Sequence, residues 1–208
     1  MSLDLFIEIV GAIIGLVYLY LEYKANVWLW PVGILMSAFY VVIYITGSFY
    51  ADAALQVYYI GANAYGLLKW TAFRRGAGGG AVSHSDTEIS AMPQRLILPV
   101  AAVSLAIWFL IYYVLKTFTD SPVPAGDAFT TALSIVAMWM LSRKYMEQWL
   151  LWVVVNIVSV ILYFWKGLYP TAILYIVYVV IATLGYFRWR REARKRESRV
   201  FETKRDEF

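Results

Sequence analysis

Seven long apolar segments, separated by polar stretches, constrain the fold of this chain more than any other feature. Each has roughly 16 to 22 residues, about the length with which an α-helix crosses a hydrocarbon core of ~30 Å at ~1.5 Å per residue. Hydrophobic residues make up 62% of the 208 residues and charged residues 15%, a balance that excludes a soluble globular domain. The sequence predicts an all-α integral membrane protein with transmembrane helices at 4–22, 27–46, 52–71, 95–116, 127–142, 147–165 and 169–188.

The lysine and arginine residues divide unevenly between the two sides of the predicted membrane. With seven crossings, Lys116 and Lys166 are the ones on the side of the N-terminus, and the other 16 of the 18 lie on the opposite side. Because Lys and Arg of short loops concentrate in the cytoplasm, we expect the N-terminus outside and the C-terminus inside. The basic tail after Arg188 is expected to contact anionic lipids of the inner leaflet rather than nucleic acid.

The stretch between the third and fourth predicted helices is polar and rich in glycine, and we expect a flexible linker there. Its glycines do not form a G-x-G-x-x-G pattern, which argues against a phosphate-binding loop. His84, the only histidine, lies in this polar linker, where a solvated loop residue is expected, and the chain has no cysteine. We therefore expect no metal, no cofactor and no enzymatic activity.

A shift of 119 residues aligns one part of the chain with another without a gap. The matches carry the second helix onto the sixth and the third onto the seventh, an even displacement that gives both halves the same orientation. The aligned pairs are Trp30 with Trp149, Tyr44 with Tyr163, Tyr50 with Tyr169, Ala53 with Ala172, Leu55 with Leu174, Tyr59 with Tyr178, Gly66 with Gly185, Lys69 with Arg188 and Trp70 with Trp189.

This shift predicts two parallel three-helix repeats joined by a linking helix. The expected organisation is a first repeat at 1–71, a cytoplasmic glycine-rich linker at 72–94, a linking helix and loop at 95–126, a second repeat at 127–188 and a basic cytoplasmic tail at 189–208. In transporters built from such repeats, the substrate site lies between the halves near the middle of the membrane.

Two predicted helices carry polar side chains on one face. Trp149, Trp152 and Asn156 follow the spacing i, i+3, i+7, which places them within about 60° of one another around a helix. Gln56, Tyr59 and Asn63 repeat the spacing in the third helix. A buried amide without a partner is unfavourable in hydrocarbon, so we expect both faces to point into the helix bundle.

Two structural interpretations compete with a binding site on these faces. Asn and Gln commonly join transmembrane helices through hydrogen bonds, and Trp and Tyr gather at the membrane interface. Trp28, Trp30, Trp70, Trp165 and Trp189 lie near helix ends and fit the interfacial role. Trp152 and Asn156 lie progressively deeper, which favours a ligand site.

The residue types indicate what such a site would bind. Indole rings stack on aromatic rings and attract cations, and amides pair with carboxamides and sugar hydroxyls. Every Lys and Arg lies at a helix end or outside, so we expect a dephosphorylated ligand that is neutral or singly cationic. The carboxylates also fall near helix ends, which favours facilitated diffusion over proton coupling.

Three segments carry a resemblance to a known family: "LQVYYIGANAYG", "SRKYMEQWLLWVVVN" and "KGLYPTAILY". The chain resembles the PnuC family of bacterial vitamin transporters, and the resemblance covers nearly its whole length. The resemblance implies a seven-helix core of two three-helix repeats, related in architecture to the SWEET sugar transporters. It also implies a homotrimer in the bacterial inner membrane that carries nicotinamide riboside by facilitated diffusion, with trapping by cytoplasmic phosphorylation.

When the motifs are matched residue by residue, the resemblance implies a substrate site at Gln56, Asn63, Trp149, Trp152 and Asn156. Tyr59 is added because it shares their helical face. The chain departs from many relatives in having Leu67 where they have tryptophan. Thiamine, another flat cationic heterocycle, is therefore the alternative substrate, and a membrane scaffold without transport activity is the alternative of a different class.

Overall fold

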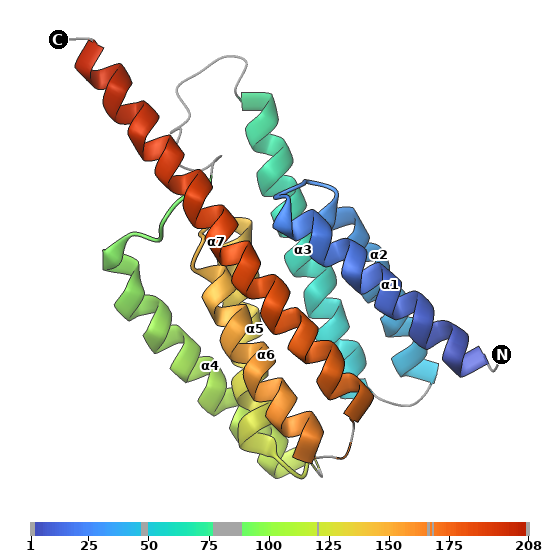
Figure 1. Ribbon diagram of the computed structural model, residues 1–208. Helices are drawn as coiled ribbons and strands as arrows, with labels where there is room; N and C mark the ends of the chain where they lie inside the picture. Colours follow the sequence, from blue (N-terminus) through green and yellow to red (C-terminus); the bar gives the residue numbers. More distant parts are fainter. Residues whose placement is uncertain are drawn as a thin grey trace. The chain divides into compact units, whose positions relative to one another are not determined.

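The computed structural model describes residues 3–46, 50–76, 89–119, 121–165, 167 and 169–206. Within these residues the regular structure is helical, and the seven predicted helices are present (Figure 1). They are α1 (Leu3–Tyr23), α2 (Leu29–Thr46), α3 (Tyr50–Gly76), α4 (Ile97–Phe118), α5 (Pro124–Ser142), α6 (Gln148–Trp165) and α7 (Tyr169–Asp206), with a short 3-10 helix, η2 (Gln94–Leu96), before α4.

Four helical stretches of the described chain are long and apolar enough to cross a membrane: Gln94–Phe118, Pro124–Ser142, Gln148–Trp165 and Thr171–Lys195. Two shorter apolar stretches, Ile13–Tyr23 and Leu29–Val42, belong to α1 and α2. These lengths agree with a multi-pass membrane protein.

The helix ends differ from the sequence prediction mainly at α7. The predicted helix stops at residue 188, whereas α7 has 38 residues and continues without interruption through the basic tail. Arg and Lys are good helix formers, and no proline or glycine follows Gly185, so nothing local ends the helix where its composition turns polar. At its N-terminal end, α5 begins at Pro124, a residue suited to the first helical turn.

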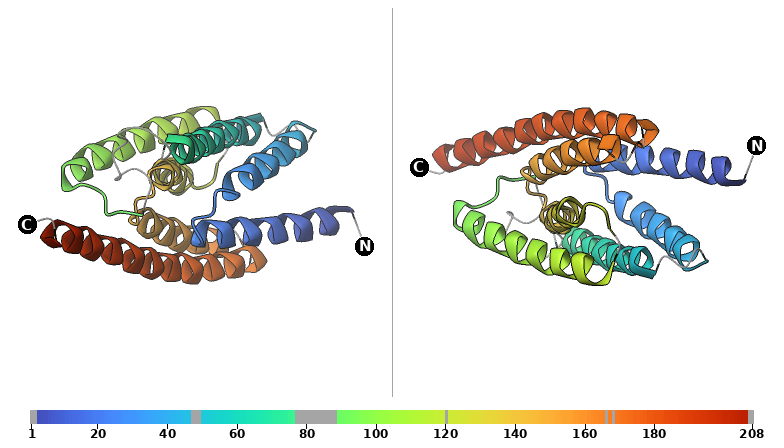
Figure 2. Two further views of the ribbon diagram at one scale, coloured as in Figure 1. Left: turned by 90° about the horizontal axis from the view of Figure 1, so that it is seen from above. Right: turned by 90° about the horizontal axis from the view of Figure 1, so that it is seen from below.

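The chain divides into two compact units, Met1–Thr87 and Glu88–Phe208. In the first unit, α2 packs against α3, and α1 packs against α2. In the second unit, α6 packs against α7, and α5 packs against both α4 and α6. The orange and red ribbons of Figure 2 show α6 and α7 lying side by side.

Burial in the second unit separates a central helix from a peripheral one. Nine residues of α5 are buried, whereas α4 has none. The side chains of Leu98 and Phe118 in α4 are 79% and 73% exposed. An apolar helix with this exposure suits contact with hydrocarbon, because a surface of this kind is unfavourable in water.

The turns after α1 and α5 have the same hydrogen-bonding pattern. Ala25 and Lys144, which are 119 residues apart, adopt positive φ angles of 51° and 56°. The N–H of Ala25 donates to the carbonyl of Glu22 at 2.9 Å, and the N–H of Lys144 donates to that of Leu141 at 2.9 Å. In each turn the following N–H donates to the carbonyl of the preceding residue in the helix. Asn26 donates to Leu21 at 2.9 Å, and Tyr145 donates to Met140 at 3.1 Å. Both turns are Schellman motifs, which satisfy carbonyls left open at a helix end.

The α2/α3 and α6/α7 interfaces also contain the same arrangement of aromatic rings. Trp30 meets Trp70 edge to face at 5.2 Å between ring centroids and 89° between planes. Trp149 meets Trp189 at 5.8 Å and 86°. In each interface one ring also covers a glycine, Gly66 under Trp30 and Gly185 under Trp149.

The end of the predicted linker 72–94 is bonded to the second unit. Residues 72–76 belong to α3, and residues 77–88, which include His84, lie outside the described residues. Ser90 exchanges hydrogen bonds with the turn between α5 and α6: its N–H donates to the carbonyl of Lys144 at 3.1 Å, and its carbonyl accepts from Met146 at 2.9 Å. The N–H of Met92 donates to the Glu147 carboxylate at 2.9 Å. The segment before α4 is therefore held against this turn.

Candidate functional site

The polar face of α3 carries the first set of predicted site residues. Gln56 and Tyr59 are partly exposed, whereas Asn63 is 3% exposed. The Asn63 Nδ2 donates to the carbonyl of Tyr59 at 2.7 Å. Its Oδ1 is buried and accepts no hydrogen bond from the part of the chain that the structure describes. One end of the amide is thus fixed by its own helix, and the other end can accept a hydrogen bond.

Gly33 in α2 makes room for this amide. A Cβ at position 33 would collide with Oδ1 of Asn63 and would lie 2.7 Å from its Cγ. A Cβ atom does not make contacts that short in real structures, so any larger residue at position 33 would displace the amide. Gly33 could not be identified from the sequence, because a single glycine in an apolar helix has no periodic signal.

The polar face of α6 carries the second set. Trp152 is partly exposed, and its Nε1 is buried without a hydrogen-bond acceptor among the described residues. Asn156 lies one turn further along and is 7% exposed. An indole N–H and an amide, one turn apart on the same face, can together orient a polar heterocycle.

Trp149 differs from Trp152 in its surroundings. It is fully buried, and its ring contacts Trp189 and covers Gly185 on α7. Trp30 has the corresponding contacts in the first unit. The ring of Trp149 therefore has a clear packing role in the α6/α7 interface.

The six predicted residues thus form two sets, one on α3 and one on α6. Neither set includes a charged group: α6 has no charged residue along its whole length, and none lies between Gln56 and Asn63 on α3. No group of three His, Asp or Glu side chains that could hold a metal ion occurs in the described part of the chain. The chemistry available on both faces consists of hydrogen bonds and aromatic contacts.

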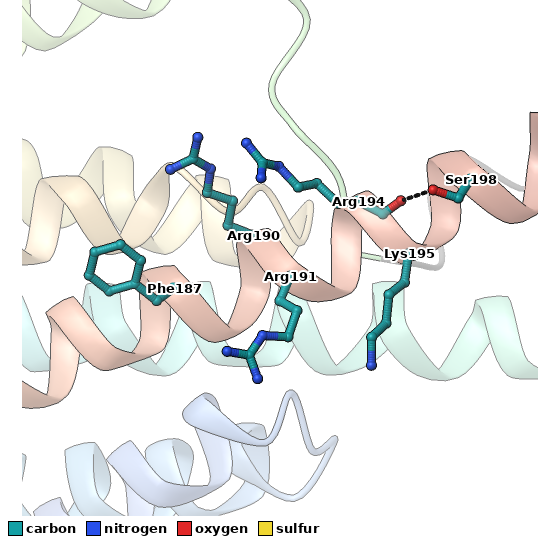
Figure 3. Close-up of a pocket in the computed structure, with 6 residues that line it drawn as sticks. All are labelled: Phe187, Arg190, Arg191, Arg194, Lys195 and Ser198. Carbon is teal, nitrogen blue, oxygen red and sulfur yellow. Dashed lines mark hydrogen bonds between the residues drawn. The ribbon is translucent and has the colours of Figure 1, made fainter.

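An open, basic surface hollow of about 460 Å³ lies elsewhere, along the polar extension of α7. Figure 3 shows its lining, in which the residues recur every three or four positions and so share one helical face. The lining residues are Phe187, Arg190, Arg191, Arg194, Lys195 and Ser198. None of the predicted substrate residues contributes to it, and its charge suits an anion rather than the ligand expected at α3 and α6.

One polar residue near the α6 set was absent from the sequence prediction. Gln148, the first residue of α6, is 0% exposed, and both its Oε1 and its Nε2 lack hydrogen-bond partners among the described residues. At the start of a helix, a glutamine is ordinary in sequence, and only its burial makes it notable.

The chain is similar to known transporter proteins. The family model described as "Nicotinamide mononucleotide transporter" matches residues 5–191. The nicotinamide riboside transporter PnuC of Escherichia coli (strain K12) is 30% identical over 93% of this chain and 89% of its own length. The riboflavin/roseoflavin transporter RibM of Streptomyces davaonensis is 28% identical over 94% and 89%.

A solved structure has a similar fold. The crystal structure of the vitamin B3 transporter PnuC superimposes with a TM-score of 0.68, covering 89% of this chain and 81% of that chain at 24% identity.

Proposed function

The chain belongs to the nicotinamide mononucleotide transporter family, and on that premise we propose that it carries nicotinamide riboside across the membrane by facilitated diffusion. The observation that carries this proposal is the uncharged polar face of α6, where the Trp152 Nε1 and the Asn156 amide are buried one turn apart. A nicotinamide ring offers a flat cationic surface for the indole, and the carboxamide and ribose hydroxyls offer partners for the amide.

The riboside is favoured over the mononucleotide because neither face has a cation. A phosphate is normally bound by Arg, Lys or a row of backbone N–H groups. The continuous α6 helix presents none of these, and its 18 residues are uncharged. Burying a phosphate beside it would leave at least one negative charge without a partner.

The proposed substrate residues are Gln56, Tyr59, Asn63, Trp149, Trp152 and Asn156. Within this set, Trp152, Asn156 and Asn63 are assigned the direct polar contacts, since each has a buried polar group on the relevant face. Trp149 is assigned a supporting role, because its ring packs on Trp189 and Gly185.

We propose that the transporter consists of two parallel three-helix repeats, α1–α3 and α5–α7, joined by α4, as in SWEET-like architecture. The paired Schellman turns and the paired Trp–Gly–Trp contacts, each related by 119 residues, support this organisation. Two segments with independent histories would have no reason to share backbone turns and ring contacts at one fixed offset.

The distribution of charge supports an orientation with the N-terminus outside the bacterial inner membrane and the C-terminus in the cytoplasm. In that orientation the basic face of α7 meets anionic lipid headgroups. The resemblance to the PnuC family supports a homotrimer and trapping of the imported riboside by cytoplasmic phosphorylation. Transport by the named relatives supports a role other than that of an enzyme.

Two other vitamins are competing substrates. Thiamine is favoured by Leu67, which replaces a tryptophan of many relatives, and riboflavin is favoured by the similarity to RibM. Both present a flat ring without requiring a phosphate. A competing function of a different class is that of a membrane scaffold without transport activity. Such a scaffold would bind neither nicotinamide riboside nor thiamine nor riboflavin.

Calorimetric titration of the purified protein with riboside, thiamine and riboflavin tests the proposal. We expect riboside to bind, and binding of thiamine or riboflavin alone would refute the substrate assignment. Trp152→Ala and Asn156→Ala should each weaken binding at least tenfold at an unchanged melting temperature. If both variants bind as tightly as the wild type, the site lies elsewhere.

A further inference from the structure

The first residue of α6 extends the polar face beyond the predicted site. Gln148, Trp152 and Asn156 follow i, i+4, i+8, so their side chains form one row along the helix. Ser159, at 7% exposed, continues the row, which has a length of about 16 Å at ~1.5 Å per residue. Gln148 therefore lies one turn before Trp152 in the same direction.

Among the buried polar side chains of the described residues, Gln148 is the one with both a donor and an acceptor left without a partner. The side chain is 0% exposed, and neither Oε1 nor Nε2 has a partner within the described chain. A buried amide without partners opposes folding, since its hydrogen bonds to water are lost and not replaced. A glutamine with a purely structural role would be expected to hydrogen-bond a neighbouring helix.

The first unit shows that this position does not need a polar side chain. Leu29 lies 119 residues before Gln148, begins α2 as Gln148 begins α6, and is likewise 0% exposed. The backbone around both residues is alike: Leu29 donates to the carbonyl of Asn26 at 3.1 Å, and Gln148 donates to that of Tyr145 at 3.3 Å. The same fold thus accepts an apolar residue here, and the glutamine needs another explanation.

We propose that Gln148 is a further substrate-binding residue, whose carboxamide forms hydrogen bonds with a hydroxyl or carboxamide of the bound vitamin. The inference rests on the proposed function and adds a contact to its site. The amide has both a donor and an acceptor available, and the adjacent Trp152 Nε1 is available as a donor. Ligand binding satisfies groups that the protein itself leaves without partners.

Two apolar replacements test this role. Gln148→Leu copies the residue of the first unit, and Gln148→Met keeps the length of the side chain while removing the amide. We expect both variants to raise the Kd for nicotinamide riboside about five- to tenfold, the effect of one lost hydrogen bond, in calorimetric titration of the purified protein. Their melting temperatures should equal or exceed that of the wild type, because the unpaired buried amide is gone. Leu29→Met is the matched control and should leave the Kd within about twofold of the wild type.

The outcomes separate this inference from the function on which it rests. If the wild type binds and both Gln148 variants bind as tightly, Gln148 does not contact the substrate, whatever their stability. If the wild type binds thiamine or riboflavin instead, the same comparison is made with that vitamin. If it binds none of the three, the proposed function is refuted, and the assignment of Gln148 with it.

Discussion

Replacing Gly185 by alanine should destabilise the α6/α7 interface. An added Cβ would lie 2.7, 2.7 and 2.8 Å from three atoms of the Trp149 ring, where ordinary contact begins near 3.4 Å. The ring is fully buried and held by Trp189, so it has little room to move. Gly66 faces Trp30 in the same way in the first unit, and Gly66→Ala should have the same effect.

The magnitude follows from two opposing terms. Alanine is favoured over glycine within a helix by up to about 1 kcal/mol, while overpacking a filled interface costs about 1–3 kcal/mol. Gly61 is the matched control, because it also lies within a helix and a Cβ there would have no atom within 4 Å. The propensity term is shared, so Gly185→Ala should be less stable than Gly61→Ala by about 1–3 kcal/mol.

Thermal unfolding of the purified variants measures this difference. On the usual scale for chains of this size, it corresponds to a melting temperature about 2 to 12 °C lower for Gly185→Ala than for Gly61→Ala. Equal melting temperatures for the three alanine variants would show that the Trp–Gly contacts do not hold these interfaces together.

The remaining predictions concern the substrate site and the energetics of transport. Trp152→Phe keeps an aromatic ring but removes the buried indole N–H, so the Kd for the riboside should rise about five- to tenfold in calorimetry. An unchanged Kd would show that Nε1 does not contact the ligand. Gly33→Ala should weaken riboside binding at least fivefold, because the added Cβ displaces the Asn63 amide although residue 33 does not touch the ligand. A variant that binds the riboside with wild-type affinity would exclude Asn63 as a contact. Since α6 has no acidic or basic side chain, collapsing the proton gradient should change initial riboside uptake into vesicles by less than about twofold, and loss of uptake would indicate proton coupling.

The helices were predictable because membrane spans are set by length and hydropathy. The proposed repeat also had a sequence signal, since Trp, Gly and a basic residue recur at one offset, and the paired contacts of Trp30 and Trp149 support the proposal. Turn geometry was hidden, because Ala25 and Lys144 are not residue types that indicate a positive φ angle.

The features that sequence reasoning missed depend on contacts between distant segments. The hydrogen bond from Met92 to Glu147 joins residues 55 positions apart. The ordered C-terminal end of the predicted linker could therefore not be recognised from the glycine-rich sequence around it. Gly33 matters only because Asn63 lies opposite. Gln148 stands out only once its burial is known, since a polar residue at a helix start is otherwise expected.

Uptake by proteoliposomes tests the central claim most directly. Purified protein is reconstituted into liposomes, and the initial uptake of labelled nicotinamide riboside is compared with that of nicotinamide mononucleotide, with Asn156→Ala as the binding-deficient control. A site of indole and amide groups without a cation predicts saturable riboside uptake at least tenfold faster than uptake of the mononucleotide, and its loss in the variant. Uptake of the mononucleotide at an equal or higher rate would contradict this account of the site.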